Sequence, residues 1–315
     1  MTNVPHTGFH AMGTRCNIVL PGLEEDDADV IFRHIRSEIA RIEGKLSRFL
    51  DNSDISRINA TAAEKPLEVS QEIFRILKSC VYYHGKTDGC FDITLRPVLQ
   101  FWKDNPYGNS KVASEILSRI GTGKVRLNER YRTVAFSNDS IEIDLGGFGK
   151  GYALEKVNEM LQRFGVESGF LTMGESSVLT LGNHPAGDHW KVGIKNYLHP
   201  DEAVHTFQMR YGSVSTSSNF FIDDEGKLIN HRHVIDPVTG VPVEELITAS
   251  VFSNTALLAE VLSTASLVMS EERIQNLVDQ FPGICVLKVD YSTGEAVKNV
   301  WGAKMEVSTS DKPLN

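Results

Sequence analysis

The chain has 315 residues, of which 41% are hydrophobic and 23% charged, as is ordinary for a globular protein. This length is long for one average domain and short for two. The formal net charge is −9 and the pI is near 5.6. Proteins that bind nucleic acids or anionic membranes contact phosphates through clustered Lys and Arg, and this sequence contains no basic run. We therefore expect no nucleic-acid partner.

The start of the chain lacks the features of an export signal. Residues 1–8 contain no basic n-region, no apolar stretch and no lipobox cysteine. No apolar run is long enough to cross a bilayer. We expect a cytoplasmic protein from the sequence as written, or a periplasmic one if an export signal has been removed. Structural zinc is not expected, because no Cys-x-x-Cys pair occurs among the four cysteines. These are Cys16, Cys80, Cys90 and Cys285.

In the first half of the chain, hydrophobic periodicity predicts mainly helices. The clearest is a long helix over 26–46, because Ile31, Ile35 and Ile39 recur on one face. The polar segment 47–59 is expected to be a loop with a short helical turn. The other expected elements are a strand over 13–20, helices over 71–83 and 95–102, a helical piece near 114–120 and a hairpin-like stretch near 132–137.

The second half is expected to be richer in strands. A short strand containing Ile141 and Ile143 leads into a glycine-rich turn, and a helix follows over 152–164. Helices and strands are interleaved without a steady βαβ rhythm, which indicates an α+β fold in one compact, two-lobed unit. The remaining expected elements are strands over 169–173, 177–181, 190–195, 205–210, 213–216, 248–253 and 283–289, and helices over 257–269 and 272–280.

The glycine-rich turn is the most informative segment. Asp144-Leu-Gly-Gly-Phe-Gly-Lys-Gly151 places four glycines in six positions. Glycine lets a backbone approach a ligand closely, and N–H groups at a helix start beside Lys150 suit an anion. The spacing matches neither the P-loop nor the dinucleotide fingerprint. The segment is therefore either a phosphate cradle or a tight strand-to-helix turn that binds nothing.

Two polar segments have both a functional and a plainer interpretation. Residues 46–59 carry capping and turn-forming side chains, which are typical of a well-capped loop. Residues 214–219 place consecutive hydroxyls after a strand. Such hydroxyls can ligate a metal or contact phosphate oxygens, and they also occur in solvated turns.

Two further clusters contain groups suited to catalysis or metal binding. His233 lies three residues before Asp236, next to Thr239, so it is either an acid–base residue or a structural histidine. Glu260 and Thr264 are four residues apart and share one helix face. Their oxygens are hard ligands suited to Mg²⁺ or Ca²⁺ rather than zinc. The plainer alternative is a glutamate packed on a helical threonine.

Together and in this order, the clusters resemble the ApbE family, the FAD:protein FMN transferases. The resemblance extends from Met12 to about Met269, and several motifs in one order are more specific than any single one. The matching pieces are Met12-Gly-Thr14, Ser47 to Asn59, Phe91-Asp-Ile-Thr94 with Trp102, Asp144 to Tyr152, Gly174-Glu-Ser, Thr216-Ser, His233 to Gly240 and Glu260 to Thr264.

The resemblance implies a fold and an activity. The fold would be a compact α+β domain of the family's own type, related to the T-fold, over residues 1–305, with FAD bound between two lobes and a frayed tail over 306–315. Members of the family cleave the pyrophosphate of FAD in a Mg²⁺-dependent reaction. They transfer FMN through its phosphate onto a Thr or Ser of an acceptor protein and release AMP.

The resemblance also implies roles for individual residues. His233 would be the general base for the acceptor hydroxyl, or a transient nucleophile, and Lys150 and Asp144 would complete the catalytic set. Mg²⁺ would be held by Glu260, Thr264 and the main-chain carbonyl of Gly149. The residues expected to contact FAD are Met12, Asn59, Trp102, Gly147, Gly149, Lys150, Gly151, Glu155, Gly174, Glu175, Thr216, Ser217 and His233.

The sequence departs from the usual family pattern at several of these positions. Glu260 and Glu155 stand where Asp is usual, and Gly149 stands where Ala is usual. A Gly-Gly pair is usual where this chain has Met173-Gly174-Glu175, and Thr-Ser-Gly is usual where it has Thr216-Ser217-Ser218. None of these changes removes a type of functional group, so we expect a divergent but active transferase. The alternatives are a noncatalytic FAD carrier or sensor and a metal-dependent FAD pyrophosphatase. The all-oxygen site leaves Mg²⁺, Ca²⁺ and Mn²⁺ open.

Overall fold

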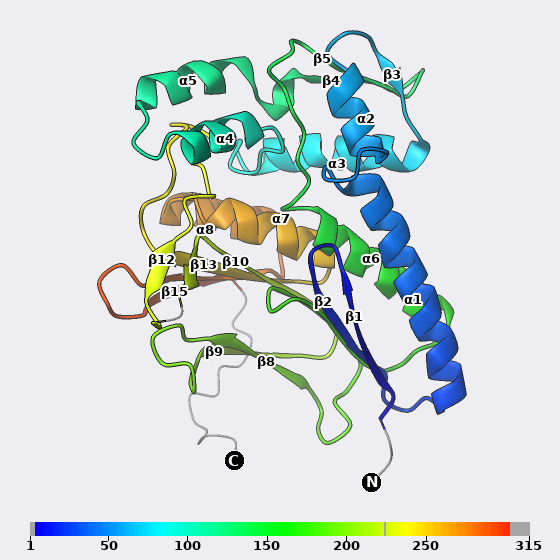
Figure 1. Cartoon of the computed structure of the whole chain (residues 1–315). Helices are drawn as coiled ribbons and strands as arrows, with labels where there is room; N and C mark the ends of the chain where they lie inside the picture. The colour runs from blue at the N-terminus through cyan, green and yellow to red at the C-terminus, as the bar shows by residue number, and fades with distance from the viewer. Residues whose placement is uncertain (1–3, 224, 303–315) are drawn as a thin grey trace. The chain divides into compact units, whose positions relative to one another are not determined.

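The computed structural model describes residues 4–223 and 225–302 and shows a mixture of helices and antiparallel strands (Figure 1). The predicted α+β class is therefore confirmed. The chain divides into two compact units. The first, here called the sheet unit, contains Met1–Ala40, Lys150–Asn230 and Glu245–Asn315, and the second, the helical unit, contains Arg41–Gly149 and His231–Glu244. The predicted tail over 306–315 lies outside the described residues.

The sheet unit is built on one eight-stranded antiparallel sheet with the strand order β1-β2-β6-β7-β10-β13-β14-β15. Every residue of β7 and β13 is buried, so both faces of the sheet's centre are covered. The strands are β1 (His6–Ala11), β2 (Thr14–Val19), β6 (Gly169–Met173), β7 (Ser177–Leu181), β10 (Gly212–Ser218), β13 (Ile247–Ser253), β14 (Cys285–Asp290) and β15 (Val297–Gly302).

Different elements cover the two faces of this sheet. Helix α7 packs against β10 and β13, and α8 packs against β14 and β15. Figure 1 shows the β8–β9 hairpin on the face opposite α7. A cluster of buried apolar side chains, including Phe207, Phe252 and Leu287, fills the space under this hairpin. The covering elements are α6 (Gly149–Arg163), α7 (Ala256–Ser266), α8 (Glu271–Gln280), β8 (Trp190–Lys195), β9 (Ala203–Met209), β11 (Phe220–Ile222) and β12 (Leu228–Asn230).

The helical unit combines four helices with a small antiparallel sheet of order β3-β5-β4. Serine side chains begin two of the helices, because Ser53 and Ser70 each accept a bond from a backbone N–H of the first turn. The long helix α1 (Glu25–Leu46) contributes residues to both units. The other elements are α2 (Asp54–Thr61), α3 (Gln71–Lys86), α4 (Arg96–Asp104), α5 (Ser110–Arg119), a 3₁₀ turn (Thr122–Lys124), β3 (Leu67–Glu68), β4 (Val125–Asn128) and β5 (Thr133–Phe136).

Most predicted elements match the structure to within a few residues, and the exceptions have physical reasons. The strand expected around Ile141 and Ile143 is wrong, since this segment has no strand assignment. Its backbone pairs with a side chain, as described below, rather than with another strand. The strands β1 and β15 were not predicted. They are the edges of the large sheet, where residues stay largely exposed and the apolar alternation is weak.

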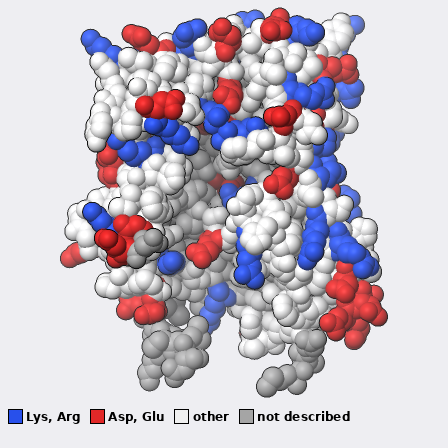
Figure 2. Space-filling view, viewed as in Figure 1, with Lys and Arg blue, Asp and Glu red and all other residues white. Residues whose placement is uncertain are grey.

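Charged side chains of both signs are interspersed on the face shown in Figure 2. The main gathering of one sign lies at the start of α1, where Glu25, Asp26 and Asp27 occupy the first turn. Carboxylates at this end of a helix are stabilised by the helix dipole. Within residues 4–223 and 225–302, no helix combines the length and the apolar character needed to span a bilayer.

Candidate functional site

The sheet unit contains a buried carboxylate that several elements surround. Glu260 lies on α7, and its side chain is only 4% exposed. Its Oε1 accepts a bond from Nζ of Lys150, on the first turn of α6, at 2.6 Å. Its Oε2 accepts bonds from the hydroxyls of Ser177 on β7 at 2.7 Å and Ser215 on β10 at 2.8 Å. The structure therefore brings together two of the predicted residues, Lys150 and Glu260, with Ser215 of the hydroxyl-rich segment 214–219 and with Ser177, which the sequence analysis did not identify.

Hydroxyl groups extend this cluster along α7 and β10. Ser217 Oγ lies 2.9 Å from Ser263 Oγ and 3.4 Å from Thr264 Oγ1. Thr264 also donates to the backbone carbonyl of Glu260 at 3.1 Å. Thr216 points instead to Ser250 of β13, with 2.8 Å between the hydroxyl oxygens. The predicted pair Thr216 and Ser217 is thus split, and only Ser217 faces the Glu260 cluster.

The close approach of α6 and α7 depends on a glycine. A Cβ at Gly151 would lie 2.5 Å from Cβ of Glu260 and 2.7 Å from the carbonyl oxygen of Ala256. Both distances are shorter than any van der Waals contact allows. Gly151 therefore has a packing role that places Lys150 beside Glu260, rather than a need for unusual backbone dihedrals.

The side chains of Glu260 and Thr264, two of the predicted metal ligands, make hydrogen bonds within the sheet unit. Glu260, Thr264 and the carbonyl of Gly149 offer oxygen donors, which suits a hard cation. However, both carboxylate oxygens of Glu260 already accept bonds from protein donors, one of them the Lys150 ammonium. Gly149 is the first residue of α6. Among the described residues, no group of three or more His, Cys, Asp or Glu side chains could hold a metal.

The expected phosphate cradle is also partly closed by internal bonds. The N–H of Gly146 donates to Asp144 Oδ1 at 2.9 Å, and the N–H groups of Phe148 and Gly149 both donate to the carbonyl of Leu145. The other carboxylate oxygen of Asp144 pairs with Nε of Arg48 at 2.7 Å. The segment is therefore a turn organised by Asp144, and α6 begins at Gly149, three residues before the predicted start.

Asn59 holds the chain immediately before this turn. Its Nδ2 donates to the carbonyl of Ile143 at 2.9 Å, and its Oδ1 accepts from the N–H of Ile143 at 2.8 Å. The amide thereby satisfies both backbone groups of Ile143, as a neighbouring strand would. Asn59, which the sequence analysis predicts to contact the nucleotide, thus fixes the backbone of the residue next to Asp144.

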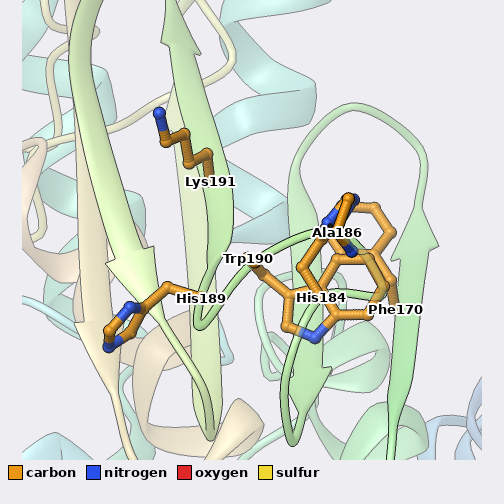
Figure 3. Close-up of a pocket in the computed structure, with 7 residues that line it drawn as sticks. Phe170, His184, Ala186, His189, Trp190 and Lys191 are labelled. Carbon is orange, nitrogen blue, oxygen red and sulfur yellow. Dashed lines mark hydrogen bonds between the residues drawn. The ribbon is translucent and has the colours of Figure 1, made fainter.

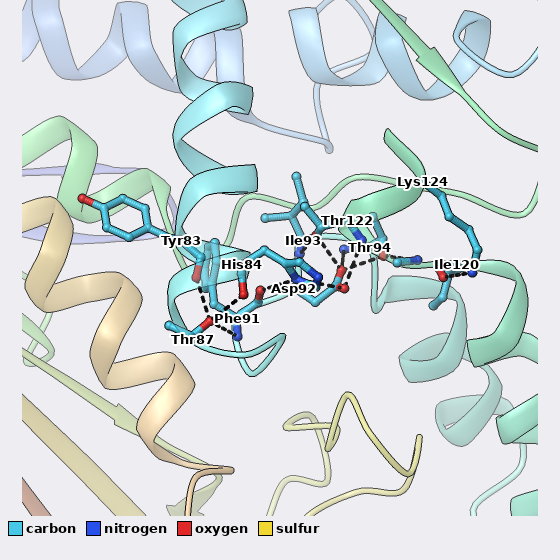
Figure 4. A network of polar contacts seen from close by, with 11 residues as sticks. Tyr83, His84, Thr87, Phe91, Asp92, Ile93, Thr94, Ile120, Thr122 and Lys124 are labelled. Atoms are coloured by element: carbon cyan, nitrogen blue, oxygen red, sulfur yellow. Dashed lines mark hydrogen bonds and ion pairs between the residues drawn. The ribbon is translucent and has the colours of Figure 1, made fainter. Parts of the chain in front are cut away.

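A second buried carboxylate, Asp92, supports the same turn (Figure 4). Its Oδ1 accepts bonds from the N–H and hydroxyl of Thr94 at 2.7 and 2.6 Å, and from the hydroxyl of Thr122 at 2.9 Å. Its Oδ2 accepts from the N–H of Thr122 at 3.0 Å. The next residue, Ile93, accepts a bond from the N–H of Asp144 at 2.8 Å. The motif Phe91-Asp-Ile-Thr94 was noted in the sequence, but its role as a support was not.

Trp102 and His233 lie in the helical unit. The indole N–H of Trp102 donates to the carbonyl of Gly240 at 2.7 Å, and the residue is 8% exposed. His233 lies in the segment that leads into the turn at Asp236, which forms as predicted. The His233 side chain reaches solvent, yet loss of hydration, together with the nearby His231 and Lys103, lowers its pKa to about 4. The ring is therefore neutral at neutral pH and able to accept a proton.

Met12, Gly174 and Glu175 lie at two turns of the sheet unit. Met12 sits at the tip of the β1–β2 hairpin with φ of 51°, which is uncommon for a residue with a side chain. Gly174 has φ of 64°, and a Cβ there would lie 2.6 Å from Thr14 Oγ1. Glu175 is exposed between β6 and β7. The N–H of Gly174 donates to the carbonyl of Arg15 at 2.7 Å, which ties the turn after β6 to β2.

Glu155 has a structural contact that the sequence analysis did not anticipate. Its Oε2 accepts a bond from the N–H of Ala256, the first residue of α7, at 2.9 Å. Thr255, at the N-cap of α7, makes no side-chain capping bond. Glu155 therefore caps α7 from α6. Its burial raises the pKa of the carboxyl group, although the bonds from the backbone of Ala256 and Leu257 act in the opposite direction.

Comparison with known proteins identifies the relationship that these residues suggest. The profile of the ApbE family matches residues 12–287, which is most of the chain. The chain belongs to the ApbE family. The match includes every residue for which the sequence analysis predicted a role, from Met12 to Thr264.

Other ApbE proteins are related to this chain at moderate identity. The FAD:protein FMN transferase of Vibrio cholerae is 24% identical over 298 residues, which cover 90% of this chain and 88% of that protein. The FAD:protein FMN transferase of Escherichia coli K12 is 25% identical over 280 residues, or 85% and 79% of the two chains. The crystal structure of the ApbE protein from Thermotoga maritima superimposes with a TM-score of 0.81 at 25% identity, covering 94% of this chain and 96% of that one.

This ApbE protein also has a cavity that none of the predicted site residues lines (Figure 3). Its volume is about 390 Å³. The walls include Phe170, His184 and Trp190, with their aromatic rings in contact. The Trp190 N–H donates to the carbonyl of Leu181, so the indole is already anchored in the fold. None of the residues that line this cavity belongs to the motifs identified in the sequence analysis.

Proposed function

We propose that this protein transfers FMN from FAD, through the FMN phosphate, to a Thr or Ser hydroxyl of an acceptor protein and releases AMP. The protein is an enzyme of the flavin transferase class, because it belongs to the ApbE family and its relatives are named FAD:protein FMN transferases. The observation that carries the proposal is the family match over residues 12–287, which contains all of the proposed site residues.

The reaction exchanges the phosphoanhydride bond of FAD for a phosphoester bond to the acceptor. The acceptor hydroxyl oxygen forms a bond to the FMN phosphorus, and the bond from that phosphorus to the bridging oxygen of the pyrophosphate breaks. The electron pair and the bridging oxygen leave with AMP. The hydroxyl proton must go to a base, because a neutral hydroxyl is a weak nucleophile at neutral pH. Phosphoryl transfer otherwise requires positioning and charge neutralisation.

His233 is the proposed base. Its pKa is lowered to about 4, so the imidazole is neutral at neutral pH and has a lone pair available for the acceptor proton. The Phe91–Thr94 motif and Asn59 would act indirectly in this proposal, because both fix the backbone on the N-terminal side of Asp144.

Dependence on Mg²⁺ is part of the proposal because of the resemblance and the oxygen donors of Glu260 and Thr264. A divalent cation bound to a pyrophosphate neutralises charge on its oxygens. The Glu260 carboxylate also accepts bonds from Lys150 and two serines. Removal of divalent cations with EDTA is expected to stop the transfer, and restoring Mg²⁺ is expected to recover it.

Intact-mass spectrometry of a protein that carries a flavinylation motif tests the proposal. The acceptor is incubated with this protein, FAD and Mg²⁺, and FMN and AMP are assayed in the same tube. An acceptor mass raised by FMN less water, with release of AMP, supports the transferase. Unmodified acceptor with free FMN and AMP indicates a pyrophosphatase, whereas intact bound FAD indicates a carrier.

The His233→Ala variant tests the base. We expect it to lower the transfer rate by roughly 10²–10⁴-fold, the usual contribution of a general base. His231→Ala is the matched control, because His231 is the ring neighbour of His233 at 4.9 Å between centroids. A His233→Ala protein that labels the acceptor at the normal rate would show that another group takes the proton.

A further inference from the structure

The ion pair between Lys150 and Glu260 differs from the ordinary surface ion pairs of this chain. The Glu260 side chain is 4% exposed and that of Lys150 is 23% exposed, with 2.6 Å between Nζ and Oε1. By comparison, Lys156 pairs with Glu159 on the same helix α6, and there both side chains are at least 30% exposed. A buried carboxylate is stable only when it is paired or well hydrogen-bonded, and Lys150 supplies the positive charge.

We propose that the Lys150 ammonium is a built-in cation that competes with divalent metal ions for the Glu260 carboxylate. The ammonium is held at one carboxylate oxygen while the Ser177 and Ser215 hydroxyls occupy the other. A divalent ion at the same carboxylate would have to displace these donors or bind against the charge of Lys150. The inference predicts that Lys150 weakens the affinity of this site for divalent cations.

The packing of α6 and α7 explains why the ammonium stays in place. Gly151 follows Lys150 directly. Because Gly151 has no Cβ, its backbone on α6 can lie against the Glu260 Cβ and the Ala256 carbonyl of α7. Glu155, one turn further along α6, caps the start of α7. These two contacts fix α6 against the start of α7, next to the ion pair. Lys150 therefore meets Glu260 through a rigid backbone rather than through a mobile loop.

Thr264 marks where a competing cation would bind. Its hydroxyl donates to the carbonyl of Glu260 and lies near Ser217. The hydroxyl oxygen is therefore on the side of α7 that carries Glu260. Neutral oxygen ligands alone bind divalent ions weakly, and a carboxylate is needed to supply charge. The binding free energy of the cation must then offset the cost of separating Glu260 from Lys150.

The inference rests on the proposed function only for the choice of a divalent cation, and its test contains neither FAD nor an acceptor protein. Mn²⁺ is titrated into the full chain, and the free ion is followed by its electron paramagnetic resonance signal. The proteins compared are the wild type, Lys150→Met, Lys150→Gln and the control Lys156→Met, which removes the exposed ion pair of the same helix. A failed transferase assay would leave this test unaffected.

We expect Lys150→Met to bind Mn²⁺ at least about tenfold more tightly than the wild type, because a full positive charge in contact with the site is removed. Lys156→Met should bind like the wild type. In the double variant Lys150→Met with Glu260→Gln, the gain should disappear, which assigns it to the carboxylate. Lys150→Gln keeps a donor for Glu260 without the charge, and it should show a smaller gain.

Two results would overturn the inference. One is an affinity of Lys150→Met for Mn²⁺ equal to or weaker than that of the wild type, because Lys150 would then not compete. The other is a gain that persists after Glu260→Gln, because the cation would then bind elsewhere. If Lys150→Met does not fold, Lys150→Gln decides the question, since it preserves a hydrogen bond to Oε1 and is read in the same way.

Discussion

Two buried carboxylates in the described part of the chain, Asp92 and Glu260, are satisfied in different ways. Asp92, in the helical unit, is 6% exposed and accepts four bonds from the backbone and hydroxyls of Thr94 and Thr122. Glu260, in the sheet unit, is 4% exposed and accepts one bond from the Lys150 ammonium and two from serine hydroxyls. The bonds to Asp92 come mainly from neutral groups close to it in the fold. Glu260 instead accepts a bond from the charged end of a flexible lysine side chain.

This difference separates a structural carboxylate from one that can exchange its partner. Backbone N–H groups cannot leave Asp92 without unfolding the turns that carry them. A lysine side chain can move away from Glu260 while its helix stays in place, because only rotations about side-chain bonds are needed. The comparison therefore predicts that substitutions around Asp92 affect stability most, and that substitutions around Glu260 affect cation binding more than stability.

The largest effect is expected for Asp92→Ala. This change removes four hydrogen bonds and leaves the N–H groups of Thr94 and Thr122 without their acceptor, so we expect a loss of about 2–4 kcal/mol of unfolding free energy. Urea unfolding followed by circular dichroism measures it. Asp92→Asn, which keeps one carbonyl oxygen, is the matched control and should lose less. Equal losses for both variants would show that charge, and not the bonds to oxygen, stabilises the motif.

Gly151→Ala tests the packing that holds Lys150 beside Glu260. The added methyl would lie 2.5 Å from the Glu260 Cβ, so we expect a loss of about 1–3 kcal/mol from overpacking. Gly44→Ala on α1 is the matched control, because nothing lies within 4 Å of a Cβ there. That variant should gain about 0.5–1 kcal/mol from helix propensity. Thermal unfolding measures both, and a stabilised Gly151→Ala would contradict the described contact between α6 and α7.

A smaller change in stability is expected for Lys150→Met. Solvent reaches part of the lysine, which screens the ion pair, and the two serines continue to satisfy Oε2 of Glu260. We expect a loss of about 1 kcal/mol in urea unfolding. Lys156→Met should change stability by less than this. A loss as large as that of Asp92→Ala would mean that the two carboxylates are equally structural.

The smallest effect concerns His233 and pH. Its pKa in the folded protein, about 4, is below the ordinary value of 6.5, so the unfolded chain binds more protons between these values. The neutral ring thus contributes stability that is fully present above about pH 6.5 and is lost as the pH falls to about 4. Because the side chain reaches solvent, we expect this contribution to be about 1 kcal/mol or less. In His233→Gln, the dependence of unfolding free energy on pH over this range should become flatter by that amount.

Several features of the fold could be predicted from local sequence. The helix α1 follows from the spacing of Ile31, Ile35 and Ile39, and the strands β6, β7 and β8 have the predicted bounds. In each case, the periodicity of apolar residues reflects burial on one or both faces of the element. This periodicity can be read from residues that are close together in the chain. Edge strands such as β15 escaped prediction because exposure removes this pattern.

The sequence by itself determined the family, the α+β class and the types of group that gather in the site, since these depend on motifs and periodicity. The tertiary structure alone decided which groups meet. Lys150 meets Glu260 although they are 110 positions apart in the chain. Asn59 satisfies the backbone of Ile143, as a neighbouring strand would, and Glu155 caps α7. Such contacts depend on how elements pack across long separations, and no local pattern encodes the partner of a buried polar group.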